Sequence, residues 1–304
     1  MIDDEAARLK NEEHCDIVVL LEHEAADKIP VVSNVDAIFG GHAHLNKEAS
    51  IGGVPSLATK NYGRGIAHIE LKIDKSTKEV SYSSSEVDVM TNEKCRPLAE
   101  NEGIKTILNQ YAPSINSIKN IELATAVDDL KFNEALKNIC TKTMFDNAVD
   151  FGKEESEIDE SKIICAFHNV NGGIRDDIKA GKITYGSVYS AFPFDNEVVL
   201  LKAKGSFLRN KLKNMSNLGV YRTFKEKEDI EPDSDYYVAT TDYLALSDES
   251  FNSAQKWKVM TDEDLIRTGK VVRDIVTQRI YELDQLKTSD FPETVNYQNI
   301  PLGW

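Results

Sequence analysis

Three histidines near the N-terminus have the residue type and spacing of metal ligands. His23 follows one apolar run, and His42 and His44 follow the next as His-Ala-His. Imidazole nitrogens suit zinc, manganese or iron, and two successive strands that end in histidine can share an ion. Gly40 and Gly41, just before His42, free the backbone for a tight turn and a close approach to a ligand. The pattern predicts a metal site, with a purely structural loop as the simpler alternative.

A loop around Arg175 has the composition of an anion-binding site. Gly172 and Gly173 follow a strand-like run and expose backbone N–H groups, and Arg175 adds a planar, permanently charged guanidinium that suits phosphate. Asn171 lies in the same loop and is a second candidate for ligand binding. A plain strand–turn–helix with a surface arginine explains this loop equally well when it is taken alone.

The motif Phe192-Pro193-Phe194 could present an aromatic ring to a ligand. Proline fixes the direction of the chain, so one phenylalanine could be held outward as a stacking platform. The alternative is that both phenylalanines belong to the core.

Hydrophobic periodicity predicts an α/β chain in which helices and strands position these residues. In the first ninety residues we expect helices near 4–13 and 25–33, strands at 16–21, 36–39 and 65–74, and β-rich sequence over 55–87. In the second part we expect helices at 132–147, from 206 and at 262–284, and strands at 163–167, 198–203 and 236–240. A weaker helical pattern over 96–120, interrupted at Pro113, connects the two parts.

Composition narrows the classes of ligand. The chain has 304 residues, is 41% hydrophobic and carries a formal charge of -15, which indicates a globular protein of about two domains. Nucleic acid and anionic membranes need a basic protein face, so both are poor candidates as partners. Small phosphorylated ligands remain compatible, because a few local cations and backbone N–H groups can hold them.

The cysteines and the N-terminus give no sign of secretion. The cysteines are scattered and lack a Cys-x-x-Cys pair, which favours buried free thiols over disulfides. The acidic start Met1–Glu5 is not a signal peptide, and no apolar run reaches the roughly 18 residues of a membrane helix. The chain as it stands is expected to be cytoplasmic.

Four sequence blocks together resemble a known family. They are Gly-Gly-His-x-His at 40–44, Asn-Gly-Gly-Ile-Arg at 171–175, Gly-x-Ile-Thr-Tyr-Gly at 181–186 and Pro-Phe-Asp-Asn at 193–196. In this order and spacing they resemble the 5′-nucleotidase family of metallophosphoesterases, which includes apyrases and periplasmic UDP-sugar hydrolases. The resemblance implies the last third of a layered α/β/β/α metallophosphoesterase domain at 1–93. It also implies a helical linker at 94–120 and an α+β substrate-binding domain at 121–304.

The resemblance assigns expected roles to the candidate residues. His23 and His42 match ligands of one ion of a two-metal site, and His44 matches a ligand of the other. In the second domain, Arg175 matches a phosphate-binding arginine, with Asn171 in the same loop. Phe194 matches one of two rings that sandwich the nucleobase, and the candidate for the second ring is Phe251, where glycines of the family pattern are replaced by Ser247, Glu249 and Ser250.

The family's other metal motifs do not occur in this sequence. Asp-x-His, Gly-Asp-x-x-Asp and Gly-Asn-His-Asp/Glu are all absent from residues 1–304. Two-metal phosphatases use both ions, one to activate water and both to clamp the phosphoryl oxygens. Three imidazoles without a bridging carboxylate are therefore expected to hold at most one zinc or manganese ion, weakly. The missing half is expected in the same gene or in a partner chain.

The function expected from the resemblance is hydrolysis of nucleoside 5′-phosphates in nucleotide catabolism, by a chain that is incomplete or catalytically impaired. The alternative is a non-catalytic relative that binds a nucleotide without turning it over.

Overall fold

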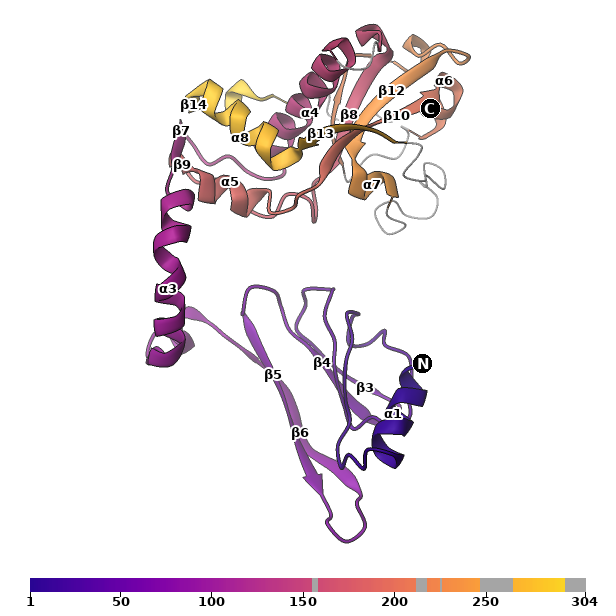
Figure 1. Ribbon diagram of the computed structural model, residues 1–304, viewed down its shortest axis with the longest axis vertical. Helices are drawn as coiled ribbons and strands as arrows, with labels where there is room; N and C mark the ends of the chain where they lie inside the picture. The colour runs from indigo at the N-terminus through magenta and orange to yellow at the C-terminus, as the bar shows by residue number, and fades with distance from the viewer. Residues whose placement is uncertain (155–157, 212–217, 225, 247–264, 293–304) are drawn as a thin grey trace. The chain divides into compact units, whose positions relative to one another are not determined.

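The computed structural model describes residues 1–154, 158–211, 218–224, 226–246 and 265–292. The chain divides into two compact units, Met1–Lys105 and Thr106–Trp304, and each is described on its own (Figure 1). Helices and strands are mixed along both units, so the predicted α/β class is confirmed.

The first unit is built on a four-stranded sheet of order β1-β2-β4-β3. The neighbours β1–β2 and β2–β4 are parallel, whereas β3 runs antiparallel to β4. The strands are β1 (Val19–Leu21), β2 (Ala37–Phe39), β3 (Lys47–Ile51) and β4 (Val54–Ala58). Helix α1 (Ile2–Asn11) has acidic residues in its first turn and basic residues in its last, as the helix dipole favours. The core consists of Ala6, Val18, Ile29, Val35 and Ile38.

A long antiparallel hairpin completes this unit. Strands β5 (Gly65–Ile73) and β6 (Val80–Val89) pair along their whole length, and β5 alternates half-buried and exposed residues. A short helix, α2 (Asn92–Cys95), follows, and then α3 (Glu102–Lys119). The weak helical pattern of the sequence is thus a helix, but it continues through Pro113 instead of ending before it.

The second unit contains a five-stranded sheet of order β11-β8-β12-β10-β13 and a three-stranded sheet of order β14-β7-β9. The five strands are β8 (Ile163–Asn169), β10 (Glu197–Lys204), β11 (Leu218–Arg222), β12 (Asp235–Thr241) and β13 (Leu265–Val271). The smaller sheet comprises β7 (Glu122–Ala126), β9 (Gly181–Thr184) and β14 (Gln285–Leu286).

Helices cover both faces of the larger sheet (Figure 1). Because strand side chains alternate between faces, Val198 and Leu200 of β10 enter one core and Val199 and Leu201 enter the other. The first core is completed by α4 (Ala135–Glu154), α5 (Tyr185–Ala191) and α8 (Val272–Leu283), and the second by α6 (Gly205–Lys211) and α7 (Asp242–Leu246). Short 3₁₀ turns lie at Glu160–Lys162, Lys227–Asp229 and Thr288–Asp290.

Two helix predictions are wrong. The segment 25–33 forms turns, although Ala26 and Ile29 are buried as a helix face would be. Pro30 lacks an N–H donor and disfavours the helical conformation of the residue before it, which is why helical spacing there does not produce a helix.

The last helix begins later than the predicted range, 262–284. Residues Leu265–Val271 form β13, and α8 starts at Val272. The apolar spacing continues across the junction, so it does not reveal where the strand changes into a helix. Gly269, at φ +69°, interrupts the pattern just before that junction.

All four cysteines are free, as expected, but only two are buried. Cys140 and Cys165 lie in the cores, whereas Cys15 is half-buried and Cys95 is exposed. Within the part of the chain that the structure describes, no helix has the length and apolarity needed to cross a membrane.

Candidate functional site

The parallel pairing of β1 and β2 brings His23 and His42 together. Leu21 and Phe39 are register partners at the carboxyl ends of the two strands, and the histidines follow two and three residues later. Parallel strands end at the same edge of a sheet, so both side chains emerge there. The distance from Nε2 of His23 to Nδ1 of His42 is 3.4 Å, and the ring centroids lie 5.2 Å apart at 73°.

The loop that carries His42 has an unusual backbone. A Cβ atom on Gly40 would lie 2.6 Å from the backbone oxygen of Glu24, so only glycine fits there. Both His42 (φ +57°) and His44 (φ +53°) adopt the left-handed conformation. For a non-glycine residue this costs on the order of 1 kcal/mol, and such strain tends to occur at functional sites.

The distance between two of the predicted metal ligands is compatible with a shared ion and equally with a hydrogen bond between the two rings. Nitrogens bound to one tetrahedral zinc at about 2.1 Å each lie about 3.4 Å apart, which is the spacing that His23 and His42 show. A catalytic zinc site normally has three protein ligands. Across the described residues, however, no three His, Cys, Asp or Glu side chains gather as a group that could hold a metal. His44 is exposed in the same loop and does not complete one.

In the second unit, the loop that carries Arg175 follows the carboxyl end of β8. A Cβ atom on Gly173 would lie 2.3 Å from the backbone oxygen of Asn169, and Gly172 has φ +95°, so both glycines are required by geometry. The backbone N–H of Arg175 donates to the oxygen of Ala191 at 2.8 Å. This bond ties the loop to the end of α5, directly before Phe192-Pro193-Phe194.

Arg175 and Phe194 consequently lie side by side. The Cζ atom of Arg175 is 5.2 Å from the centroid of the Phe194 ring, a cation–π distance. Phe194 is 38% exposed and Phe192 only 2%, so one ring points outward and the other enters the core. Asn171 is exposed in the same loop, with a backbone bridge to Ile174. The second aromatic candidate, Phe251, lies outside the described residues.

A buried histidine lies at the end of β8, next to the loop that carries Arg175. His168, the second-last residue of β8, is 2% exposed, and its Nδ1 lies 2.9 Å from the oxygen of Asn169. Burial lowers the pKa of His168 from 6.5 to about 4, while its contact with the Asn169 backbone opposes the shift. The ring is therefore neutral at physiological pH.

One residue beside Phe194 was not predicted from the sequence. Arg273, the second residue of α8, is 8% exposed and forms an ion pair with Asp195. A signal was available, because Arg273 is spaced three and seven residues before Val276 and Ile280 and so shares their buried face. An arginine on such a face must have polar partners to be stable there.

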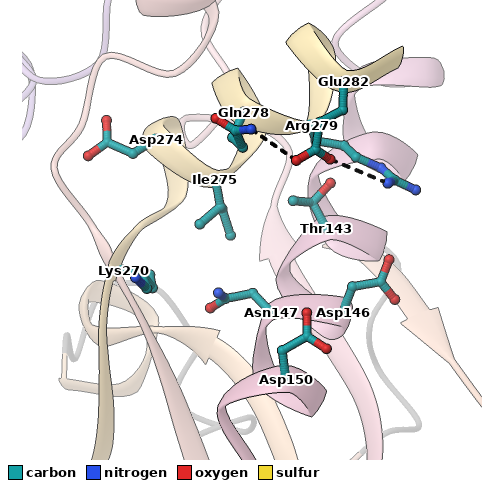
Figure 2. A pocket seen from close by; sticks show the side chains of 10 residues that line it. All are labelled: Thr143, Asp146, Asn147, Asp150, Lys270, Asp274, Ile275, Gln278, Arg279 and Glu282. Carbon is teal, nitrogen blue, oxygen red and sulfur yellow. Dashed lines mark hydrogen bonds and ion pairs between the residues drawn. The ribbon is translucent and has the colours of Figure 1, made fainter. Parts of the chain in front are cut away.

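A groove of about 400 Å³ lies elsewhere in this unit, between α4 and α8 (Figure 2). On the α8 side of the groove, Glu282 accepts a hydrogen bond from Gln278 at 3.0 Å and pairs with Arg279 at 3.8 Å. None of the expected site residues that the structure describes lines it. The lining residues are Thr143, Asp146, Asn147, Asp150, Lys270, Asp274, Ile275, Gln278, Arg279 and Glu282.

Part of the second unit is similar to a known protein family. Residues 132–224, which include Arg175 and Phe194, match the family model described as 5′-nucleotidase, C-terminal domain. Endonuclease YhcR of Bacillus subtilis is 28% identical over 177 residues, which cover 58% of this chain and 14% of that protein. An apyrase of Aedes albopictus is 22% identical over 352 residues, which cover 93% of this chain and 59% of that protein.

The fold agrees with solved structures. The crystal structure of a 5′-nucleotidase precursor from Thermus thermophilus superposes with a TM-score of 0.64 at 20% identity, covering 93% of this chain and 64% of that one. The chain therefore spans less than two thirds of the length of each of these three proteins. Residues 132–224 of this chain thus match the C-terminal domain of 5′-nucleotidases, and its fold resembles that of a solved 5′-nucleotidase precursor.

Proposed function

We propose that the second unit binds nucleoside 5′-phosphates and that the chain is part of a 5′-nucleotidase-type phosphohydrolase. The observation that carries the proposal is the pairing of Arg175 with the exposed ring of Phe194. A nucleotide offers a base that stacks on an aromatic ring and a phosphate that binds a guanidinium. Both groups come from the matched domain, and both are held by loops with fixed backbones.

The net charge of the chain bears on the class of ligand that it can bind. With a formal charge of -15, the protein as a whole repels a phosphorylated ligand, so binding has to rely on local donors. Arg175 is half-buried at the end of a glycine-bearing loop, where its charge is less screened than that of a surface lysine. A short-range site of this kind suits a compact mononucleotide better than a polymer with an extended anionic backbone.

For the hydrolytic step, a divalent ion would supply a hydroxide nucleophile at neutral pH. His23 and His42 are the residues of this chain that would contribute to holding it, as a zinc or manganese ligand pair. Their side chains are exposed and fixed at one sheet edge, and His44 follows in the same strained loop. Their role in the proposed enzyme would be to bind the ion.

A second function, nucleotide binding without turnover, is favoured by a separate observation. The histidine pair at the edge of β1 and β2 is not joined by a third His, Cys, Asp or Glu ligand within the described ranges. The nucleotide-binding loops of the second unit do not depend on that pair for their geometry.

One experiment separates these functions. The purified chain is titrated with AMP by calorimetry, and phosphate release from AMP is followed with Zn²⁺ or Mn²⁺ added. Release that disappears in His42→Ala supports the phosphohydrolase. Binding without release in any metal supports the non-catalytic relative. Failure to bind AMP at millimolar concentration rejects both functions.

A further inference from the structure

Arg273 holds the backbone on both sides of Pro193. Its Nη1 atom donates to the oxygen of Phe192 at 3.4 Å and to that of Phe194 at 3.5 Å, and its Nη2 atom donates to the carboxylate of Asp195. Tyr189 covers the guanidinium, with 4.7 Å between Cζ and the ring centroid. One side chain thus connects three loop positions to the start of α8.

Among the residues that the structure describes, few contacts besides this backbone support hold the ring of Phe194. Phe194 is 38% exposed, and Arg175 is the cation that lies over its ring. Its neighbour Phe192 is anchored by burial in the core. Pro193 fixes only its own φ angle. The direction of the Phe194 side chain therefore depends on the contacts of Arg273 with the carbonyl oxygens of Phe192 and Phe194 and with Asp195.

We propose that Arg273 is a positioning residue for nucleobase recognition: it holds Phe194 as a fixed stacking platform, and so makes the site select nucleoside 5′-phosphates over sugar phosphates that lack a base. The inference rests on the nucleotide binding proposed above. It assigns to Arg273 no contact with the ligand. The phosphate end of the ligand is held by Arg175, whose backbone is anchored separately on Ala191.

Loss of Arg273 should loosen the loop without unfolding the sheet. The backbone N–H of Val272 still donates to the oxygen of Asn196 at 2.9 Å, which keeps the start of β10 beside α8. The carboxylate of Asp195 is 78% exposed, and asparagine in its place keeps a side-chain oxygen that can accept from the buried Arg273 guanidinium. Asp195→Asn therefore tests the same contact with little risk to folding.

The test is calorimetric titration of the full chain with AMP and, separately, with ribose 5-phosphate. Arg273→Gln should weaken AMP about tenfold, on the scale of one lost base–aromatic stack, and leave ribose 5-phosphate unchanged. Asp195→Asn should shift the ratio of the two affinities in the same direction by a smaller factor. Arg273→Lys keeps the charge but loses the planar fork, and should recover part of the selectivity. Arg279→Gln, on the same helix, is the matched control and should change neither affinity.

Each outcome has a defined meaning. A fall in the affinity for AMP alone in Arg273→Gln, with partial recovery in Arg273→Lys, supports the inference. An equal loss of both ligands in Arg273→Gln, or an unchanged ratio in both Arg273→Gln and Asp195→Asn, overturns it. If Arg273→Gln does not fold, as circular dichroism would show, the ratio in Asp195→Asn decides alone. If the unmodified chain binds ribose 5-phosphate as tightly as AMP, the inference fails although phosphate binding stands. If it binds neither, the proposed function itself fails.

Discussion

The guanidinium of Arg175 lies over the ring of Phe194, with 5.2 Å between Cζ and the ring centroid. A cation–π contact between a half-buried arginine and a partly exposed ring contributes about 0.5–2 kcal/mol, which a base stack and a charged hydrogen bond to a nucleotide can offset. In the proposed site, the two side chains would form adjacent subsites, one for an aromatic group and one for an anion.

Removal of the Phe194 ring should weaken nucleotide binding. We expect Phe194→Ala to lower the affinity for AMP about tenfold, because a base–aromatic stack contributes about 1–3 kcal/mol, and Phe194→Tyr to retain it. Calorimetric titration measures both. Tyr281→Ala removes an aromatic ring that is 60% exposed on α8 and should have no effect. Equal affinities for the wild-type chain and Phe194→Ala would remove Phe194 from the site.

Substitution of Arg175 should act on the phosphate. Arg175→Lys keeps the charge but loses the bidentate fork, so AMP and ribose 5-phosphate should both bind about five- to tenfold more weakly. Lys182→Gln, an exposed cation on β9, is the control. A change confined to AMP would instead mean that Arg175 contacts the base.

Metal binding should depend on the histidine pair. In equilibrium dialysis with Zn²⁺ or Mn²⁺ we expect well under two equivalents per chain, and His23→Ala and His42→Ala should each reduce the bound metal. His68, which pairs with Glu86 on the hairpin, provides the control His68→Ala. Two tightly bound equivalents that survive His23→Ala would show that other residues form the site.

Acid should destabilise the second unit through His168. Its pKa is about 4 in the folded chain against 6.5 ordinarily, so between these values the unfolded chain binds more protons. The contribution of neutral His168 to the free energy of unfolding is complete above about pH 6.5. It decreases as the pH falls, by about 2 kcal/mol between pH 7 and pH 5. Urea unfolding of the wild-type chain and His168→Gln measures this difference. An identical pH dependence in both proteins would show that His168 is not buried in its neutral form.

The histidine pair could be predicted in part from the sequence. Apolar runs before His23 and His42 identify the two strands, whereas the parallel register that pairs Leu21 with Phe39 is seen only in the structure. The left-handed conformations of His42 and His44 could not be predicted, because local propensity disfavours them in any residue but glycine.

The loops that carry Arg175 and Phe194 could also be predicted only in part from the sequence. The sequence blocks identify Arg175 and Phe194, and the outward ring of Phe194 was one of two interpretations of Phe192-Pro193-Phe194. The contact from Arg273 to Asp195 joins positions 78 residues apart, and no local pattern reports such a pair. The division into segments 1–93, 94–120 and 121–304 stays a prediction, as do the roles of Asn171 and Phe251.

A crystal structure of the chain with AMP tests the central claim most directly. The account predicts the adenine ring stacked on Phe194 and the phosphate within hydrogen-bond distance of the Arg175 guanidinium. AMP seated in another place, such as the groove between α4 and α8, with Phe194 and Arg175 still in contact with each other, would contradict it.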